Sequence, residues 1–308
     1  MTKAKHGVYA ASITPINRSG EPDAAKLAAY SRWCIDQGLD GVAPLGTTGE
    51  GNSLPMSFRL AVPGFFANAG FASDEVIFGT GSCATGDAIA ATRAAVAAGF
   101  FNALVLPPFY YKNAAEDGLY AYYARLIEGV GDDRFRLYLY HFPQLSMTPI
   151  THTLIQRLRE GFGPVIAGLK DSSGDFDGTL GFVGAAEDFD VFPANEGVLL
   201  EGLRNGCAGV ISATTNASAS LARQTVSASG DQAMDYQETL TAVRLAIAKH
   251  PLSAALKQIQ AWRSGDDSWL DVLPPNVRLT QAQVQELRRD IDALEPRAGV
   301  LAKTRVAS

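Results

Sequence analysis

One lysine differs from the others in its surroundings. The chain has eight lysines, and Lys170 is the one that directly follows an apolar run, VIAGL at 165–169. A lysine amine partly removed from water at the mouth of an apolar strand is a good nucleophile once it has lost its proton, and it forms imines with carbonyl compounds. Lys170 is therefore a candidate catalytic nucleophile. The structural alternative is a lysine paired with Asp171 at the end of a strand.

Two threonines follow another apolar run. GTTGE at 46–50 comes directly after the run 40–45. Its two glycines allow backbone N–H groups and the hydroxyls of Thr47 and Thr48 to converge on a small anion. The alternative is an ordinary tight turn.

Aromatic residues end two further runs. Tyr140 lies near the end of the run 137–142, where a phenol can exchange a proton with a bound substrate, although core or rim packing is the alternative. The run 102–107 leads into PPFYYK at 107–112. Aromatic residues in such a loop suit packing or a subunit interface.

These residues must be positioned by eight apolar runs that alternate with segments of helical periodicity. The runs are short and several are apolar throughout, as in strands covered on both faces. Their spacing of roughly 30 residues predicts an α/β fold, a closed (β/α)8 TIM barrel in which all strands end at one mouth. An open doubly wound sheet is the alternative, but the GxGxxG turn that usually follows its first strand is missing. The expected strands are 8–14, 40–45, 75–79, 102–107, 137–142, 164–169, 189–193 and 208–213, and the expected helices are 23–37, 86–98, 116–130, 150–160, 176–187 and 197–205.

The strand signal stops after residue 216. Helical segments are expected at 218–228, 231–249, 251–264 and 280–294. The sequence therefore predicts a barrel over 1–216 and a C-terminal helical extension over 217–308, packed on the barrel.

The motifs, in this order, resemble the dihydrodipicolinate synthase / N-acetylneuraminate lyase family of Schiff-base aldolases. The resemblance covers essentially the whole chain from Gly7 onward. It implies a (β/α)8 barrel with a C-terminal helical bundle, and a homotetramer built as a dimer of tight dimers. The matching stretches are GTTGEGNSL (46–54), PPFYYK (107–112), YHFP (140–143), GLKDSSGD (168–175) and GVISATTN (209–216).

The resemblance also implies roles for the residues singled out above. Lys170 matches the lysine that forms an imine with C2 of pyruvate or of another 2-keto acid. Tyr140 matches the tyrosine that shuttles protons to the carbinolamine and to the aldehyde or hydroxyl. Thr47 and Thr48 match the hydroxyls that hold the pyruvate carboxylate and link to Tyr140.

Further positions acquire roles by the same resemblance. Tyr110 matches the tyrosine that reaches across the tight dimer to complete the proton relay, and Ile211 matches a strand residue whose backbone carbonyl lies near the nucleophile. Glu196 and Ser212 fall where sugar-acid lyases place groups that bind substrate hydroxyls. His141 replaces the usual Asn, and it either donates to a polyol substrate or packs at the strand end, with packing favoured.

One departure from the family concerns substrate choice. In the dihydrodipicolinate synthases an arginine shortly after the catalytic tyrosine clamps the carboxylate of aspartate semialdehyde. Leu145 stands at that position here, and the next arginine downstream, Arg157, falls on the following helix. Burying a carboxylate without a cationic partner is costly, so we expect a neutral, polyhydroxylated aldehyde to be the better substrate. An arginine from the C-terminal helices or from a neighbouring subunit would reverse this expectation.

The sequence thus predicts a pyruvate-dependent aldolase that acts on a 2-keto-3-deoxy sugar acid. The alternatives are a dihydrodipicolinate synthase, a dehydratase that uses the same imine, and a barrel that binds keto acids without turnover. The presence of both Lys170 and Tyr140 argues against the last of these.

Composition excludes several other classes of protein. The hydrophobic fraction is 47%, and a net charge of −6 repels nucleic acid and anionic membranes. Cys34, Cys83 and Cys207 form no CxxC pair, and we expect neither a metal site nor a cofactor. No window holds about 18 uninterrupted apolar residues. We therefore expect a cytoplasmic enzyme whose partner, apart from its own copies, is a small molecule.

Overall fold

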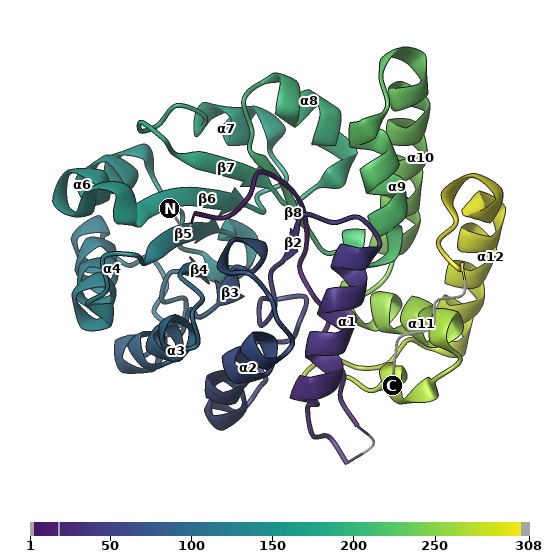
Figure 1. The fold of residues 1–308 in the computed structure, drawn as a ribbon, viewed down its shortest axis with the longest axis horizontal. Coiled ribbons are helices and arrows are strands. Elements are labelled where there is room, and N and C mark those ends of the chain that lie inside the picture. The colour runs from purple at the N-terminus through teal and green to yellow at the C-terminus, as the bar shows by residue number, and fades with distance from the viewer. Residues whose placement is uncertain (1–2, 18, 303–308) are drawn as a thin grey trace.

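Eight short parallel strands form a closed barrel in the computed structural model, which describes residues 3–17 and 19–302 (Figure 1). Backbone pairing links the strands in the orders β2-β1-β8 and β3-β4-β5-β6-β7. A parallel bridge between Val42 and Val76 joins β2 to β3, and the N–H of Ala208 donates to the carbonyl of Val191 at 2.9 Å to join β7 to β8. The strands are β1 (Gly7–Ala10), β2 (Gly41–Val42), β3 (Phe78–Gly79), β4 (Asn102–Val105), β5 (Arg136–His141), β6 (Ile166–Asp171), β7 (Asp190–Pro193) and β8 (Gly209–Ser212).

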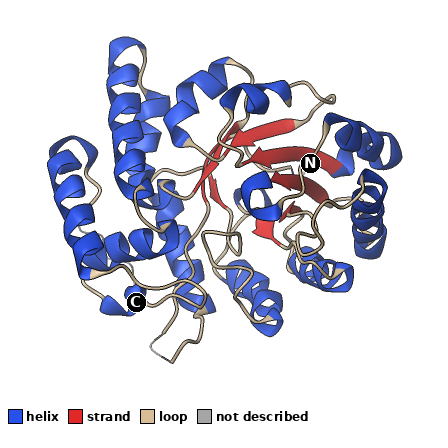
Figure 2. Cartoon of the chain, turned by 180° about the vertical axis from the view of Figure 1, so that it is seen from behind, coloured by secondary structure: helices blue, strands red, loops and turns tan. Residues whose placement is uncertain are grey.

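The predicted (β/α)8 barrel is therefore confirmed. Its interior is filled by buried side chains from the strands and their ends, so it is a packed core and not a pore. Large side chains dominate this interior, among them Tyr9, Tyr138, Tyr140, Phe192 and Ile211. Figure 2 shows the strands at the centre with helices around them.

Helices cover the outside of the barrel and follow the strands in sequence. Most begin or end with the residues expected of helix caps: Asp23 accepts the N–H of Lys26 before α1, and Gly131 adopts φ 66° after α4. The barrel helices are α1 (Ala24–Asp36), α2 (Met56–Asn68), α3 (Thr85–Ala97), α4 (Glu116–Val130), α5 (Pro143–Ser146), α6 (His152–Phe162), α7 (Phe176–Gly181), α8 (Leu199–Arg204) and α9 (Thr215–Ser227).

Helix α2 is an addition to the predicted elements. Pro63 lies inside it and supplies no N–H donor to the helix. Val62 and Phe66 are fully buried, and the ring of Phe66 lies 5.2 Å from that of Phe78 in β3. This packing against the barrel holds the segment as a helix despite the proline.

Three more helices pack beside the barrel, α10 (Gly230–Ala248), α11 (Leu252–Ser264) and α12 (Gln281–Ala298) (Figures 1 and 2). One buried cluster joins Val8 of the barrel to Ile247, Ile259 and Leu287 of these helices. Helix α10 also contacts η3 (Glu196–Val198), the short turn that follows β7. Helices α10 to α12 of the extension therefore lie close to the carboxyl ends of the strands. The division into domains at residue 217, which falls inside α9, stays a prediction.

Candidate active site

A cavity of about 580 Å³ lies at the carboxyl ends of the strands. Lys170 enters it from β6, Tyr140 from β5, and Thr47 and Thr48 from the turn after β2. Its further walls come from the C-terminal extension and from the loops after β5 and β7. The structure thus brings together four residues that are far apart in the sequence.

Lys170 and Tyr140 form the centre of this site. Lys170 Nζ donates to the Tyr140 hydroxyl at 3.3 Å, and that hydroxyl donates to Thr47 Oγ1 at 3.5 Å. Lys170 is only 4% exposed, and its Nζ lies 4.5 Å from the centre of the Tyr140 ring. The amine and the phenol are therefore held next to each other, almost completely shielded from water.

The same neighbours act on the ionisation of the phenol. Burial alone raises the pKa of Tyr140, but the charge of Lys170 and hydrogen bonds with Thr47, Ser172 and Lys170 together leave that pKa below its usual value of 10.0. A phenol with a lowered pKa gives up its proton more readily, which suits a group that moves protons at a bound substrate.

Strand register explains why Tyr140 and Lys170 meet. The two residues are paired partners on the neighbouring parallel strands β5 and β6. Paired residues on adjacent strands point to the same face, here the interior of the barrel. Their neighbours His141 and Asp171 point to the opposite face for the same reason.

Close backbone packing shapes the turn that carries Thr47 and Thr48. A Cβ atom on Gly49 would lie 2.6 Å from the carbonyl oxygen of Ser12, and one on Gly51 would overlap the carbonyl of Leu45. Both positions therefore require glycine. The carbonyl of Thr48 also accepts a hydrogen bond of 2.9 Å from Ser253 Oγ on α11.

A buried ion pair fastens this turn to the extension. Glu50, directly after the turn, pairs with Lys257 of α11, and neither side chain is exposed. The Glu50 carboxylate also accepts the N–H of Leu273 at 2.6 Å and the side-chain amide of Asn276 at 3.3 Å. The extension thus helps to hold the threonines in place.

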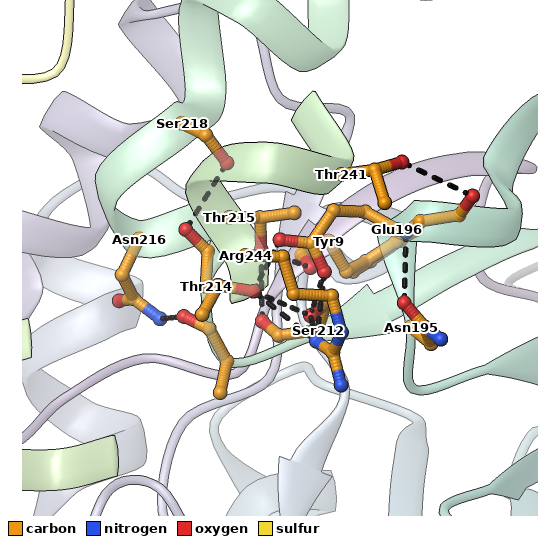
Figure 3. Close-up of polar contacts among 12 residues, drawn as sticks. Tyr9, Asn195, Glu196, Ser212, Thr214, Thr215, Asn216, Ser218, Thr241 and Arg244 are labelled. Atoms are coloured by element: carbon orange, nitrogen blue, oxygen red, sulfur yellow. Dashed lines mark hydrogen bonds and ion pairs between the residues drawn. The ribbon is translucent and has the colours of Figure 1, made fainter. Parts of the chain in front are cut away.

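A second buried cluster lies at the ends of β7 and β8 and includes an arginine. The Glu196 carboxylate accepts hydrogen bonds from Ser212 Oγ and Thr214 Oγ1, and both Glu196 and Ser212 are fully buried. Arg244 of α10 donates from Nη1 to Glu196 at 3.0 Å, to Ser212 at 3.1 Å and to Thr214 at 3.2 Å (Figure 3). Unlike Glu196 and Ser212, Arg244 lines the cavity.

Comparison with known proteins agrees with this geometry. A family model described as the dihydrodipicolinate synthetase family matches residues 4–294. The chain belongs to that family. It is therefore a lyase of the Schiff-base, class I aldolase type, and the resemblance inferred from its motifs is confirmed.

Individual relatives of this family cover most of the chain. A protein named as an uncharacterized DapA-like lyase from Chloroflexus aurantiacus is 37% identical over 84% of this chain and 87% of its own. A 4-hydroxy-tetrahydrodipicolinate synthase from a Psychrobacter species is 33% identical over 68% of each chain. The crystal structure of dihydrodipicolinate synthase from Agrobacterium tumefaciens is 29% identical, with a TM-score of 0.84 over 94% of this chain and 99% of its own.

Two of the residues matched to the dihydrodipicolinate synthetase family do not reach the cavity as expected. Glu196 and Ser212 were expected to contact substrate hydroxyls, but both are fully buried behind Arg244. Their polar atoms form hydrogen bonds with each other, with Thr214 and with that arginine. Neither side chain lines the cavity, and a substrate contact by either one stays a prediction.

His141 also turns away from the cavity. Its Nδ1 accepts the N–H of Ile150 at 3.0 Å, and its ring lies 5.4 Å from that of Phe182. Burial lowers the pKa of His141, and the nearby Asp171 offsets this only in part. The neutral ring packs at the strand end, as the favoured interpretation expected, and does not line the cavity.

Tyr110 and Ile211 occupy very different positions. Tyr110 is 72% exposed and contacts the ring of Tyr111, also exposed, at 5.3 Å between centres, and it is not part of the cavity wall in this protomer. Ile211 is fully buried in the barrel interior, paired with Tyr9 across β8 and β1. The roles that the family resemblance implies for both residues stay predictions.

Arg244 is the residue that sequence reasoning missed. It lies in the middle of a long helix, where an arginine ordinarily marks the solvated face. The carboxylate of Glu196 was singled out in the sequence as a substrate contact, and only its burial in the structure shows that it needs a cationic partner. An arginine of the C-terminal helices thus lines the cavity, which is the case in which the expected preference for a neutral aldehyde is reversed.

Two further features of the described residues bear on function. Among residues 3–17 and 19–302, no His, Cys, Asp and Glu side chains gather in a group of three or more suited to holding a metal ion. No helix in those same ranges has the length and apolar character needed to cross a membrane.

Proposed function

We propose that Lys170 forms an imine with C2 of pyruvate or of another 2-keto acid, and that the enzyme makes or cleaves the bond between C3 and C4. The observation that carries this proposal is the contact of 3.3 Å between Lys170 Nζ and the Tyr140 hydroxyl inside the cavity. Thr47 and Thr48 hold the carboxylate of the keto acid in this proposal. Their hydroxyls and the backbone of the turn present donors to a small anion.

The chemistry balances without any other reagent. Lys170 Nζ adds to the carbonyl carbon, and the carbinolamine loses water to give the protonated imine. When the C3–C4 bond of a 4-hydroxy acid breaks, its electron pair moves into the imine to form an enamine, and the 4-hydroxyl loses its proton and becomes an aldehyde. Tyr140 takes up that proton as the phenolate in cleavage and returns it in condensation. In cleavage a proton then adds to C3 of the enamine, and one water hydrolyses the imine to release pyruvate and the Lys170 amine.

For the substrate we propose a 2-keto-3-deoxy sugar acid. Leu145 lines the cavity at the position where the dihydrodipicolinate synthases carry an arginine, which separates this chain from the motif of those enzymes. Arg244 brings a different arginine to the cavity from α10, so a carboxylate on the sugar acid is compatible with the site. The second candidate is 4-hydroxy-tetrahydrodipicolinate synthesis, which the names of several relatives favour. Pyruvate release from a panel of sugar acids, measured beside condensation of pyruvate with aspartate semialdehyde, separates the two.

Trapping with borohydride tests the imine. Incubation with pyruvate and borohydride should place a reduced pyruvyl group on the peptide that contains Lys170, as found by peptide mass spectrometry. Lys170→Arg should remain unmodified, and Lys112→Arg should be trapped like the wild type because that lysine lies outside the cavity. Modification at another lysine, or none, would overturn the mechanism.

We further propose that the protein works as a homotetramer in the cytoplasm. The exposed aromatic pair Tyr110 and Tyr111, 72% and 79% exposed in the protomer, supports an interface at this loop. Light scattering at micromolar concentration measures the assembly directly.

A further inference from the structure

The guanidinium of Arg244 offers more donors to the cavity than the protein uses. Its Nη1 is fully engaged by Glu196, Ser212 and Thr214. Among the hydrogen bonds of the described residues, none involves its Nε or Nη2, and its side chain is 21% exposed. Figure 3 shows the far nitrogen of the guanidinium pointing away from the three partners.

We propose that Arg244 binds a second carboxylate, at the far end of the substrate, and that the substrate is a 2-keto-3-deoxy sugar diacid. This inference rests on the proposed imine at Lys170, because it describes the other end of the same bound molecule. The Nε–Nη2 edge of a guanidinium presents two parallel N–H donors that match the two oxygens of a carboxylate.

The buried cluster behind Arg244 gives it a fixed direction. Ser212 and Thr214 donate their hydroxyl hydrogens to Glu196, so their oxygens are free to accept from Arg244 Nη1. Three acceptors on one nitrogen hold the guanidinium in one orientation before substrate arrives, which reduces the ordering needed on binding. Glu196 lies on the Nη1 side, so a ligand on the opposite edge is closer to the cation than to that carboxylate. In this proposal Glu196 and Ser212 are positioning residues.

The spacing of the strands suits a chain of six carbons. Arg244 is anchored at the ends of β7 and β8, one and two strands from Lys170 on β6. Neighbouring strands lie about 4.8 Å apart. The ends of β7 and β8, which hold Arg244, therefore lie about 5–10 Å from β6, the strand that carries Lys170. An extended chain advances about 1.2 Å per bond, so C2 to C6 spans about 5 Å, and a hydrogen bond adds about 3 Å.

A carboxylate explains the free donors better than a hydroxyl does. A terminal hydroxyl can accept hydrogen bonds from this edge but carries no charge, whereas a carboxylate offers one oxygen to each N–H and also neutralises the cation. The cavity lining also includes the apolar residues Leu252, Ala213 and Ala194 and the uncharged polar residues Ser172 and Ser253. Arg244 is thus the cation at the ends of β7 and β8 to which a second carboxylate of the substrate would bind.

Two matched substrates test the proposal in the full-length enzyme. 2-Keto-3-deoxyhexarate and 2-keto-3-deoxyhexonate differ only at C6, a carboxylate in the first and a hydroxymethyl group in the second. We expect the wild type to release pyruvate from the hexarate with at least tenfold higher kcat/KM. Arg244→Gln should lower the ratio of the two kcat/KM values by about 10- to 150-fold, the range of a charge-assisted hydrogen bond.

The controls separate this inference from the proposed function. Arg204→Gln, at the exposed end of α8, should keep the wild-type ratio. The role of Arg244 would be overturned if the wild type preferred the hexonate, or if Arg244→Gln lost activity equally on both substrates. In either case borohydride trapping with pyruvate would still succeed, because it depends on Lys170 alone. Failure of wild-type trapping would instead overturn the imine itself. The comparison of the two substrates in the wild type needs no variant. It can therefore refute the proposal even if Arg244→Gln folds poorly.

Discussion

Replacing Lys257 by methionine removes one partner of a completely buried ion pair. Lys257 of α11 and Glu50 beside the threonine turn are both 0% exposed at their side chains. Methionine occupies much of the volume of the lysine stem but carries no charge. Among the residues that the structure describes, the variant therefore leaves the buried carboxylate of Glu50 with the N–H of Leu273 and the amide of Asn276 as its donors.

The size of the effect follows from this environment. Removing one member of a buried pair costs about 3–5 kcal/mol, and the two neutral donors that remain place the expected loss near the lower end, about 3 kcal/mol. Unfolding entropy of about 2.1 cal/mol/K per residue gives about 650 cal/mol/K for 308 residues, so the melting temperature should fall by about 5 °C. The KM for pyruvate should rise more than kcat falls, because the turn with Thr47 and Thr48 loses its anchor.

Calorimetry and steady-state kinetics measure both effects, with Lys249→Met as the matched control. Lys249 pairs with Asp290 at 2.8 Å but is 54% exposed, so the same substitution there should have a much smaller effect on stability. The double variant Glu50→Gln, Lys257→Met should recover part of the stability, because no uncompensated charge remains. Equal shifts for the two single variants, or a double variant worse than Lys257→Met, would refute the reasoning.

Three further predictions concern the tyrosines. Tyr140→Phe should reduce kcat by about 10²- to 10⁴-fold while pyruvate trapping on Lys170 persists, and a loss below roughly tenfold in steady-state assays would show that the proton takes another route. Because interactions with Lys170 and its neighbours outweigh burial and lower the pKa of Tyr140, its phenolate should form below pH 10.0 in an ultraviolet difference titration of wild type against Tyr140→Phe. The matched control is Tyr30→Phe, which should remove no absorbance change in that range because burial raises the pKa of Tyr30 well above 10.0. Tyr110→Phe should reduce kcat less than Tyr140→Phe does if water replaces a relay hydroxyl. A variant that light scattering shows to be dissociated should have the same loss of kcat as Tyr110→Phe. Full activity of a dissociated protomer would contradict the interface role.

Most of the barrel could be predicted from the sequence because its signals are local. Apolar runs and capping residues act within a few positions, so every strand lies close to an expected run and α1 nearly matches the segment 23–37. Helix α2 shows the limit of such signals. Its local sequence contains Pro63, and only the burial of Val62 and Phe66 against other elements stabilises it.

The positions of Lys170, Tyr140, Thr47 and Thr48 around one cavity were also accessible from the sequence. In a parallel barrel all strands end at the same mouth, so residues that follow different strands are brought together by the topology itself. The family motifs added which of these residues to consider. The direction of the side chains then follows from the alternation of each strand, which sends Tyr140 inward and His141 outward.

The sequence by itself thus determined the barrel and the four residues that meet at its mouth. The tertiary structure alone decided which residues of the C-terminal helices contact this site. Arg244 reaches the cavity from α10, 48 positions after Glu196, and Lys257 reaches Glu50 across 207 positions. Both contacts depend on how the C-terminal helices dock onto the barrel. That docking is set by many buried apolar contacts shared between distant segments, and no local pattern around an arginine or a lysine on a helix encodes it.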